Sequence, residues 1–273
     1  MSDRTWWLVE AGPLSPAGTM ALDEALLHRA VEAQRPHAVV RVYAWTPPAL
    51  SVGAKIDLPP LARRRCRESG VAVVRRATGG GCVLHDGDVT YSVVAPLGGR
   101  SVLDAYRWVA SGLIAGLALL GLEAAVAEHP VLGRPLDCFR AATGADLEVG
   151  GRKICGSAQV RRHGWFLQHG SIPIADIRER TAWLLGGAAD AGSTCLEQVR
   201  PGTGWDEAAE ALVAGFAAVW GSAPGRRSPD PREWRLASAV DPLDGIGDGM
   251  GDGIGKGEAV SEVSGWRHPL GMV

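Results

Sequence analysis

The sequence lacks any arrangement of cysteines that would cross-link a small fold or hold a structural metal. It has 273 residues and five cysteines, and no two of these form a Cys-x-x-Cys pair. An odd number of cysteines argues against a disulfide framework, and the missing pair argues against a structural zinc site. We therefore expect free thiols, which suit the reducing cytoplasm.

A membrane-spanning run is also missing. The longest stretch without a charged residue lies between Arg107 and Glu123 and has fifteen residues, whereas a membrane-spanning helix needs about 20. Gly112 and Gly116 stand within this stretch as a G-x-x-x-G pair. We interpret the pair as a place where a buried helix packs closely against a neighbour.

A strong charge of one sign is absent as well. The formal net charge is -2, which predicts no general affinity for nucleic acid or for an anionic membrane. Asp3, Arg4 and Glu10 surround the short apolar run at the N-terminus, so we expect no signal peptide. Hydrophobic residues make up 46% of the chain, which is ample for a core. These features predict a cytoplasmic globular protein.

Helical apolar spacing and β-branched runs follow one another irregularly along the chain. The predicted helices span residues 19–33, 59–69, 102–120 and 205–220, and the predicted strands span 38–45, 71–75 and 89–95. Gly150-Gly151 predicts a tight hairpin between 147–149 and 152–154, because a type I′ turn needs positive φ at both positions. For residues 164–174 the sequence predicts a strand pair or one bent strand. We therefore expect an α+β fold, with a mainly antiparallel mixed sheet and packed helices.

The composition changes beyond Pro224. Residues 245–257 alternate glycine with other residues in a low-complexity run. Asp248 and Asp252 within it do not have the spacing of an EF-hand loop, so we expect no calcium site. The sequence predicts one folded domain over residues 1–224 and a flexible Gly-, Asp- and Pro-rich tail over residues 225–273.

Three consecutive glycines, Gly79 to Gly81, stand in the string 75–86 (RRATGGGCVLHD). Glycine has no Cβ, so such a loop can adopt positive φ and bring its backbone close to a ligand. The string is not a Walker loop, since no Gly-Lys-Ser/Thr follows, and it lacks the spaced glycines of a dinucleotide-binding fingerprint. Taken alone, the glycines fit a ligand-binding loop and a Gly-rich hairpin turn about equally well.

The whole string resembles the RRxTGGGxVxHD motif of the superfamily of lipoate ligases, octanoyltransferases and biotin ligases. Residues 151–159 (GRKICGSAQ) and 167–171 (LQHGS) resemble a second block, and residues 18–27 and 50–53 resemble two further pieces. The blocks occur in the superfamily's order. The resemblance implies the biotin/lipoate ligase catalytic fold, which is similar to that of class II synthetases. It also implies an enzyme that attaches an acyl group to one lysine of a lipoyl or biotinyl domain.

The resemblance further implies the catalytic residues. Cys138 precedes Lys153 by fifteen residues, and its Cys-Phe pair followed by Gly-Arg-Lys resembles the cysteine-dependent octanoyltransferase branch. A thiolate exchanges with a thioester, and an amine can attack the resulting acyl-enzyme. A free cysteine is often only a small buried residue, and Cys195 is the second choice of nucleophile. Lys153 would stabilise negative charge on the acyl oxygen or relay a proton, two roles that the sequence does not separate.

For substrate binding, the resemblance implies an acyl tunnel whose small wall residues leave room for an eight-carbon chain. Arg75 is expected to meet phosphopantetheine in a transferase or phosphate in a ligase. His85 and His169 are expected to form hydrogen bonds in the pocket, although a structural role fits them about as well. The implied substrate-binding residues are Arg75, Gly79, Gly80, Gly81, His85, Gly156, Ser157, Ala158, Gln159, His169 and Gly170, and no metal ligand is expected.

The implied function is the transfer of octanoyl from acyl carrier protein to Cys138, and then to a lysine of a lipoyl domain in glycine-cleavage H protein or a dehydrogenase E2 subunit. This route needs neither metal nor ATP. One alternative is an ATP- and magnesium-dependent lipoate-protein ligase, in which Cys138 has no chemical role. Another is an amidotransferase that moves octanoyl from H protein to E2. A different class is a non-catalytic protein that binds an acyl group or a carrier protein.

Overall fold

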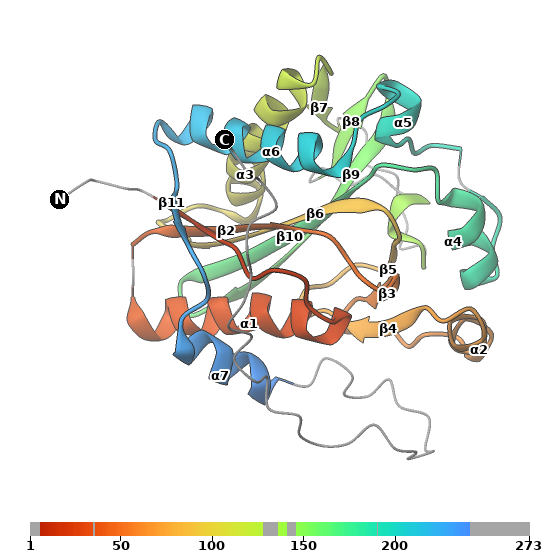
Figure 1. The fold of residues 1–273 in the computed structure, drawn as a ribbon, viewed down its shortest axis with the longest axis horizontal. Coiled ribbons are helices and arrows are strands. Elements are labelled where there is room, and N and C mark those ends of the chain that lie inside the picture. The colour runs from red at the N-terminus through yellow and green to blue at the C-terminus, as the bar shows by residue number, and fades with distance from the viewer. Residues whose placement is uncertain (1–5, 35, 128–135, 141–145, 190, 241–273) are drawn as a thin grey trace, which may run out of the picture.

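A computed structural model of the chain describes residues 6–34, 36–127, 136–140, 146–189 and 191–240. Within these ranges the chain forms a large and a small β-sheet, and helices cover both faces of the large one (Figure 1). The predicted α+β class is confirmed.

The large sheet has eight strands in the order β11-β1-β2-β6-β10-β9-β8-β7. Strand β1 pairs in parallel with β11 and β2, and the remaining neighbours pair antiparallel, which confirms a mainly antiparallel mixed sheet. The strands are β1 (Trp6–Val9), β2 (Ala38–Tyr43), β6 (Asp88–Pro96), β7 (Ala124–Val126), β8 (Leu147–Val149), β9 (Arg152–Arg162), β10 (Trp165–Pro173) and β11 (Gly225–Arg227). Strand β10 pairs with β6 along its whole length, so the segment predicted at 164–174 is one strand.

Helices α3 (Val102–Leu119) and α6 (Trp205–Trp220) cover one face of the large sheet, and α1 (Pro16–Ala33) and α7 (Pro231–Ala239) cover the other (Figure 1). The main core forms where Leu113 and Phe216 meet Tyr91 and Phe166 of the central strands. Burial of each such side chain stabilises the fold by roughly 1.5–3 kcal/mol. The helices therefore hold the sheet rigid on both sides.

Helices α3 and α6 cross at their glycines. A Cβ on Gly116 would lie 2.7 Å from the Ala211 carbonyl oxygen, and a Cβ on Gly215 would lie 2.6 Å from the Gly116 Cα. Helix α3 is long and apolar enough to span a membrane by length and composition, but here it packs against α6 and the large sheet. The interpretation of the G-x-x-x-G pair as a close helix contact is confirmed.

The small sheet has the order β4-β3-β5, with β3 at Ala49–Val52, β4 at Ala72–Arg75 and β5 at Cys82–His85. Strand β3 pairs in parallel with β4 and antiparallel with β5. The triple glycine connects β4 to β5 across the end of β3, so it is not a hairpin turn. Helices α2 (Pro60–Glu68) and α4 (Arg178–Leu185) pack beside this sheet, and α5 (Leu196–Val199) is a single short turn.

The β8–β9 hairpin turns at the predicted Gly-Gly pair. Gly150 and Gly151 have φ angles of 57° and 71°, the left-handed region that glycine favours. The hairpin does not leave Lys153 on an open sheet edge. Lys153 pairs with Glu148 on one side and bridges to Ser193 on the other, so it lies inside the fold.

Residues 225–240, which the sequence assigns to a flexible tail, fold onto the domain instead. Strand β11 pairs with β1, and helix α7 begins with Pro231 behind a capping box of Asp230 and Glu233. Proline fits the first turn of a helix, so the proline that suggested a tail begins a helix here. The low-complexity run at 245–257 lies outside the described residues.

Candidate active site

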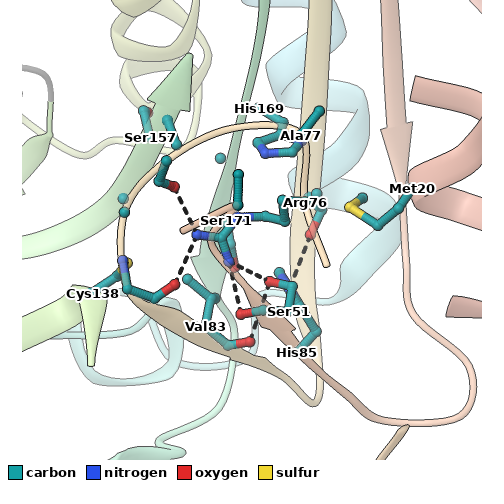
Figure 2. Close-up of a pocket in the computed structure, with 18 of the residues that line it drawn as sticks. Met20, Ser51, Arg76, Ala77, Val83, His85, Cys138, Ser157, His169 and Ser171 are labelled. Atoms are coloured by element: carbon teal, nitrogen blue, oxygen red, sulfur yellow. Dashed lines mark hydrogen bonds between the residues drawn. The ribbon is translucent and has the colours of Figure 1, made fainter. Parts of the chain in front are cut away.

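A cavity of about 620 Å³ is lined from both sheets, the glycine loop, the Cys138 segment and α1 (Figure 2). Residues far apart in the sequence therefore meet at one place. The predicted site residues that line it are Gly79, Gly80, Gly81, His85, Cys138, Lys153, Gly156, Ser157, Ala158, His169 and Gly170.

Two predicted substrate-binding residues, Arg75 and Gln159, lie outside the cavity wall. Arg75 donates from Nη1 to the carbonyl oxygens of Gly53 and Ile56, at 3.1 and 3.0 Å. Gln159 donates from Nε2 to Oε1 of Gln168 at 3.1 Å. Successive side chains of a strand point to opposite faces, and this alternation turns both residues away from the cavity. Neither side chain lines the cavity, and their contact with substrate stays a prediction.

Arg76 occupies the position expected for Arg75. Its Nη1 donates to the backbone oxygen and to Oγ of Ser51, both at 2.8 Å, and its Nη2 donates to the carbonyl oxygens of Gly79 and Gly81, both at 3.0 Å (Figure 2). The buried guanidinium therefore fixes the glycine loop to β3. The sequence signal for Arg76 was its place beside Arg75 in the same motif. The alternation of side chains along the chain decides which of the two arginines faces the cavity.

Glycine is needed at one point of this loop and at one point that packs against it. Gly80 has a φ of +90°, and a Cβ there would lie 3.3 Å from the Cys138 sulfur. A Cβ on Gly53 would lie 2.9 Å from the carbonyl carbon of Gly80. Any side chain at either position would push the loop away from Cys138.

Cys138 is half-buried and opens a short 3₁₀ turn, Cys138–Arg140. The backbone N–H of Gly81 donates to its Sγ at 2.9 Å. This hydrogen bond holds the sulfur against the glycine loop. An isolated bridge between Asp137 and Cys82 attaches this segment to the edge of β5. The segments on either side, residues 128–135 and 141–145, lie outside the described residues.

Lys153 is 4% exposed, so it is not a solvated surface charge. Its Nζ donates to the backbone oxygen of Cys138 at 2.6 Å and to Oδ2 of Asp146 at 2.9 Å. The ammonium group is thereby held against the segment that carries the thiol. Asp146 was missed from the sequence, because no motif marks it and only the fold brings it to the lysine.

The other four cysteines are poorer candidates for the nucleophile than Cys138. Burial raises the pKa of Cys66 to about 11 and the pKa values of Cys82 and Cys155 to about 12. Burial also raises the pKa of Cys195, the second choice from sequence. Such thiols carry little thiolate at neutral pH. Cys138 is the cysteine that lines the cavity in the part of the chain that the structure describes.

His85 belongs to a chain of hydrogen bonds that ends at the glycine loop. Its Nδ1 contacts Oδ2 of Asp88 at 2.8 Å, and its Nε2 contacts Oγ of Ser51 at 2.7 Å. Burial acts to raise the pKa of Asp88, but His85 and neighbouring hydroxyl groups hold it below its usual value. With Nδ1–H donating to that carboxylate, Nε2 accepts from Ser51, whose oxygen accepts from Arg76. His85 therefore organises the loop.

His169 forms a second chain of this kind. Its Nδ1 contacts Oδ2 of Asp23 at 3.3 Å, and its Nε2 contacts Oγ1 of Thr78 at 2.6 Å. Burial lowers the pKa of His169, so the ring is neutral at pH 7. Burial acts to raise the pKa of Asp23, but Arg41, His169 and Ser92 together hold it below its usual value. The ring thus anchors the start of the glycine loop.

The rest of the wall is mostly apolar or small, which suits an acyl chain. A Cβ on Gly170 would lie 2.6 Å from both the Gly156 oxygen and the Tyr91 ring, so the wall is closely packed behind the predicted small residues. The other apolar residues of the wall are Met20, Tyr43, Trp45, Ala54, Ile56, Ala77, Val83 and Val160. An apolar chain that enters this cavity would end beside Cys138 and Lys153.

The sequence is similar to several curated proteins named Octanoyltransferase LipM. The one from Geobacillus kaustophilus is 40% identical over 203 residues, covering 68% of this chain and 70% of that protein. The one from Symbiobacterium thermophilum is 36% identical over 248 residues, covering 80% and 88%. The one from Bacillus subtilis is 40% identical over 192 residues, covering 66% and 68%.

Solved structures share the fold at lower identity. Lipoate-protein ligase A bound with ATP has a TM-score of 0.70 and 21% identity, covering 86% of this chain and 93% of that chain. A structure of a bi-partite lipoate protein ligase and its E2 lipoyl domain from Thermoplasma acidophilum gives a TM-score of 0.65 and 20% identity, covering 86% and 91%. These likenesses confirm the predicted fold. Residues 15–217 also match the family described as lipoyl protein ligase A/B catalytic domain, and the chain belongs to this family.

Proposed function

We propose that the protein is a cytoplasmic octanoyltransferase of lipoate biosynthesis. It moves octanoyl from acyl carrier protein, through a thioester on Cys138, to a lysine of a lipoyl domain in H protein or an E2 subunit. The observation that carries the proposal is the position of Cys138 in the cavity wall. The Gly81 amide nitrogen lies 2.9 Å from its sulfur, and Lys153 Nζ donates a hydrogen bond to its backbone carbonyl oxygen. The similarity to proteins named octanoyltransferase supports octanoyl as the transferred group.

In the first half-reaction the Cys138 thiolate attacks the carbonyl carbon of the donor thioester. The new carbon–sulfur bond to Cys138 forms as the bond to the carrier sulfur breaks, and the carrier sulfur leaves as a thiolate that takes up a proton from water. The Gly81 amide holds the attacking sulfur. Lys153, whose Nζ donates to the backbone oxygen of Cys138, is close enough to the sulfur to stabilise negative charge that develops on the acyl oxygen. The alkyl chain is buried in the apolar cavity, where each CH₂ contributes about 0.8 kcal/mol.

In the second half-reaction the uncharged amine of the acceptor lysine attacks the Cys138 thioester. An amide forms, the bond to Cys138 breaks, and the proton of the amine passes to the departing sulfur. The acyl group is already activated as a thioester when it arrives. We therefore propose that the reaction uses neither ATP nor a metal.

A transfer assay tests this function. Octanoyl carrier protein without ATP, and octanoate with ATP and Mg²⁺, are each offered to the enzyme with a lipoyl domain as acceptor, and the acceptor mass is recorded. We expect acylation with the first donor, and a loss of about 10³-fold or more in the Cys138→Ala variant, as for removal of a catalytic nucleophile. Cys195→Ala is the matched control and should keep transfer.

Three outcomes would contradict the proposal. Full transfer by Cys138→Ala would show that the thiol is not the acyl carrier. Acylation only from octanoate with ATP would make the protein a lipoate-type ligase. Transfer from octanoyl H protein to E2, with no use of carrier protein, would assign the amidotransferase alternative.

A further inference from the structure

The cavity opens to solvent beside the start of a basic segment. Of the residues that line the cavity, Ala54, Lys55, Gly79 and Gly80 are exposed, and the others are buried or half-buried. These four therefore mark the mouth. Residues 54–68 hold five basic and two acidic side chains, whereas the whole chain has a formal net charge of -2. The mouth thus borders a positive surface on a chain that is slightly negative as a whole.

The loop between the mouth and α2 is held in one conformation by two arginines. Arg75 donates from Nη1 to carbonyl oxygens of this loop. Arg63, on α2 itself, donates from Nε to the Leu58 oxygen at 2.9 Å and from Nη2 to Oδ1 of Asp57 at 2.5 Å. The helix therefore keeps a fixed spacing from the mouth, and a protein bound to α2 would have a defined position relative to the cavity.

The exposed side of α2 combines charge with apolar surface. Leu61, Arg64, Arg65 and Glu68 are spaced by three or four residues, so they share one face of the helix. The Arg64 side chain is 61% exposed, and its Nε lies 3.8 Å from Oε1 of Glu68. An exposed pair of this kind contributes little to stability. The guanidinium of Arg64 can therefore turn to a partner at little cost to the fold.

Helix α4 extends this surface with an exposed tryptophan. Trp183 is 48% exposed, and the Arg65 guanidinium lies 5.1 Å from the centroid of its ring and donates to its backbone oxygen. The exposed side chain of Leu61 lies beside the end of α4, because a Cβ on Gly186 would be 3.1 Å from its Cδ2. We call Leu61, Arg64, Arg65 and Trp183 the α2–α4 face. Tryptophan and arginine are enriched among the residues that anchor protein interfaces.

Two partner proteins take part in the proposed reaction, and the position of the α2–α4 face favours the donor. No residue of α2 or α4 lines the cavity, so a protein bound to this face lies beside the mouth. The acceptor presents its amine on the four-carbon stem of a lysine, so a lipoyl domain has to bind over the mouth itself. The carrier protein presents its thioester at the end of a longer phosphopantetheine arm, which can reach the cavity from the side.

We propose that the α2–α4 face docks the acyl carrier protein. Its arginines pair with carboxylates on an acidic surface of the carrier, and Leu61 and Trp183 cover an apolar side chain within that surface. The phosphopantetheine arm then enters the cavity past Lys55 and brings the thioester to Cys138. The inference rests on the proposed octanoyl transfer and adds the surface that recognises the donor.

The test compares two octanoyl donors in the single-turnover acylation of Cys138, followed by intact mass. One donor is octanoyl carrier protein, and the other is octanoyl pantetheine, which has the reactive end of the arm but no protein. Arg64→Glu should lower the second-order rate constant with the carrier protein about tenfold, because charge reversal removes an attraction and adds a repulsion. The rate constant with octanoyl pantetheine should not change.

Arg226→Glu is the matched control. Arg226 is also 61% exposed and is paired with a glutamate, Glu10, but it lies on β11, at the opposite side of the molecule from α2 (Figure 1). This variant should keep the wild-type rate constants with both donors. Trp183→Ala changes the apolar part of the α2–α4 face and leaves its charge, and it should again slow acylation by the carrier protein only.

A measurement on the wild-type protein needs no variant to fold. Added salt should slow acylation by octanoyl carrier protein, because salt screens the attraction between exposed charges. Acylation by octanoyl pantetheine should not respond in this way. Equal salt dependence with both donors would count against docking through the arginines and would overturn the proposal.

The variants can overturn the proposal in three further ways. Arg64→Glu may not slow the carrier protein at all, it may slow both donors equally, or Arg226→Glu may match its effect. Selective slowing of the later transfer to a lipoyl domain would assign the face to the acceptor and would also overturn the proposal. Absence of any acyl-enzyme in the wild type with either donor would instead refute the proposed function, so the two failures are distinguishable.

Discussion

Three buried carboxylates lie around the cavity, and each has a basic partner. Asp23 pairs with Arg41, Asp88 with His85, and Asp146 with Lys153. Burial of an ionised group without a partner costs several kcal/mol, so these pairs offset the cost of placing carboxyl groups inside the fold. They hold the glycine loop and the lysine in place, and they make the stability of the protein depend on pH.

Acidification below about pH 6.5, the ordinary pKa of histidine, should destabilise the fold through His169. Burial lowers the pKa of His169, so the unfolded chain takes up this proton at a higher pH than the folded one. Where the unfolded state binds more protons, the free energy of unfolding falls as the pH falls. The lowered pKa values of Asp23 and Asp88 extend the same trend to lower pH. We expect a lower Tm at pH 5.5 than at pH 7.5.

Thermal unfolding of two variants checks the assignment to His169. His169→Gln cannot take up the proton, so its Tm should decrease less between the two pH values. His163→Asn alters an exposed histidine and should follow the wild type. An equal decrease in His169→Gln and the wild type would contradict the argument.

At the scale of elements, the glycine contacts between α3 and α6 determine how closely the two helices approach. Gly116 and Gly215 let the backbones meet, and the Phe216 ring covers Gly112. This crossing carries the larger core, which supports β6 and β10 behind the cavity. A change in the distance between these helices should therefore displace β6 and β10, and with them the cavity wall.

Gly116→Ala should destabilise the protein by about 1–3 kcal/mol, the usual range for overpacking. In an open helix the same change would add about 1 kcal/mol of stability from helix propensity. The added Cβ would lie 2.7 Å from the Ala211 oxygen, so packing should outweigh propensity. Denaturant unfolding measures the change, and Ser111→Ala on the same helix is the control, expected within about 0.5 kcal/mol of the wild type. An increase in stability would contradict the close-contact interpretation.

Most long elements were predictable, but several short ones were not. Helices α1, α3 and α6 have enough turns to show an apolar period, and β6 is a long β-branched run. Strands β3, β5 and β7 have only three or four residues each, too few for a period to stand out. Cys138 and Lys153 were named through motif resemblance. Arg76 and Asp146 needed the structure, because strand alternation and the approach of distant segments decide where those side chains lie.

At the scale of the whole molecule, the site exists because two sheets meet. The small sheet supplies the glycine loop and Ser51, and the large sheet supplies Lys153 and the small-residue wall of β9 and β10. The Cys138 segment closes the cavity between them through its bridge to β5. The central claim is that this arrangement makes Cys138 the carrier of an acyl group.

The most direct test of this claim is the mass of the enzyme after incubation with octanoyl carrier protein alone. We expect the mass of one octanoyl group on the intact protein and, after peptide fragmentation, its location on Cys138. Hydroxylamine should remove the group, as it does for a thioester. An octanoyl group on another residue, or no adduct together with an acyl-adenylate formed from ATP and free octanoate, would contradict the account.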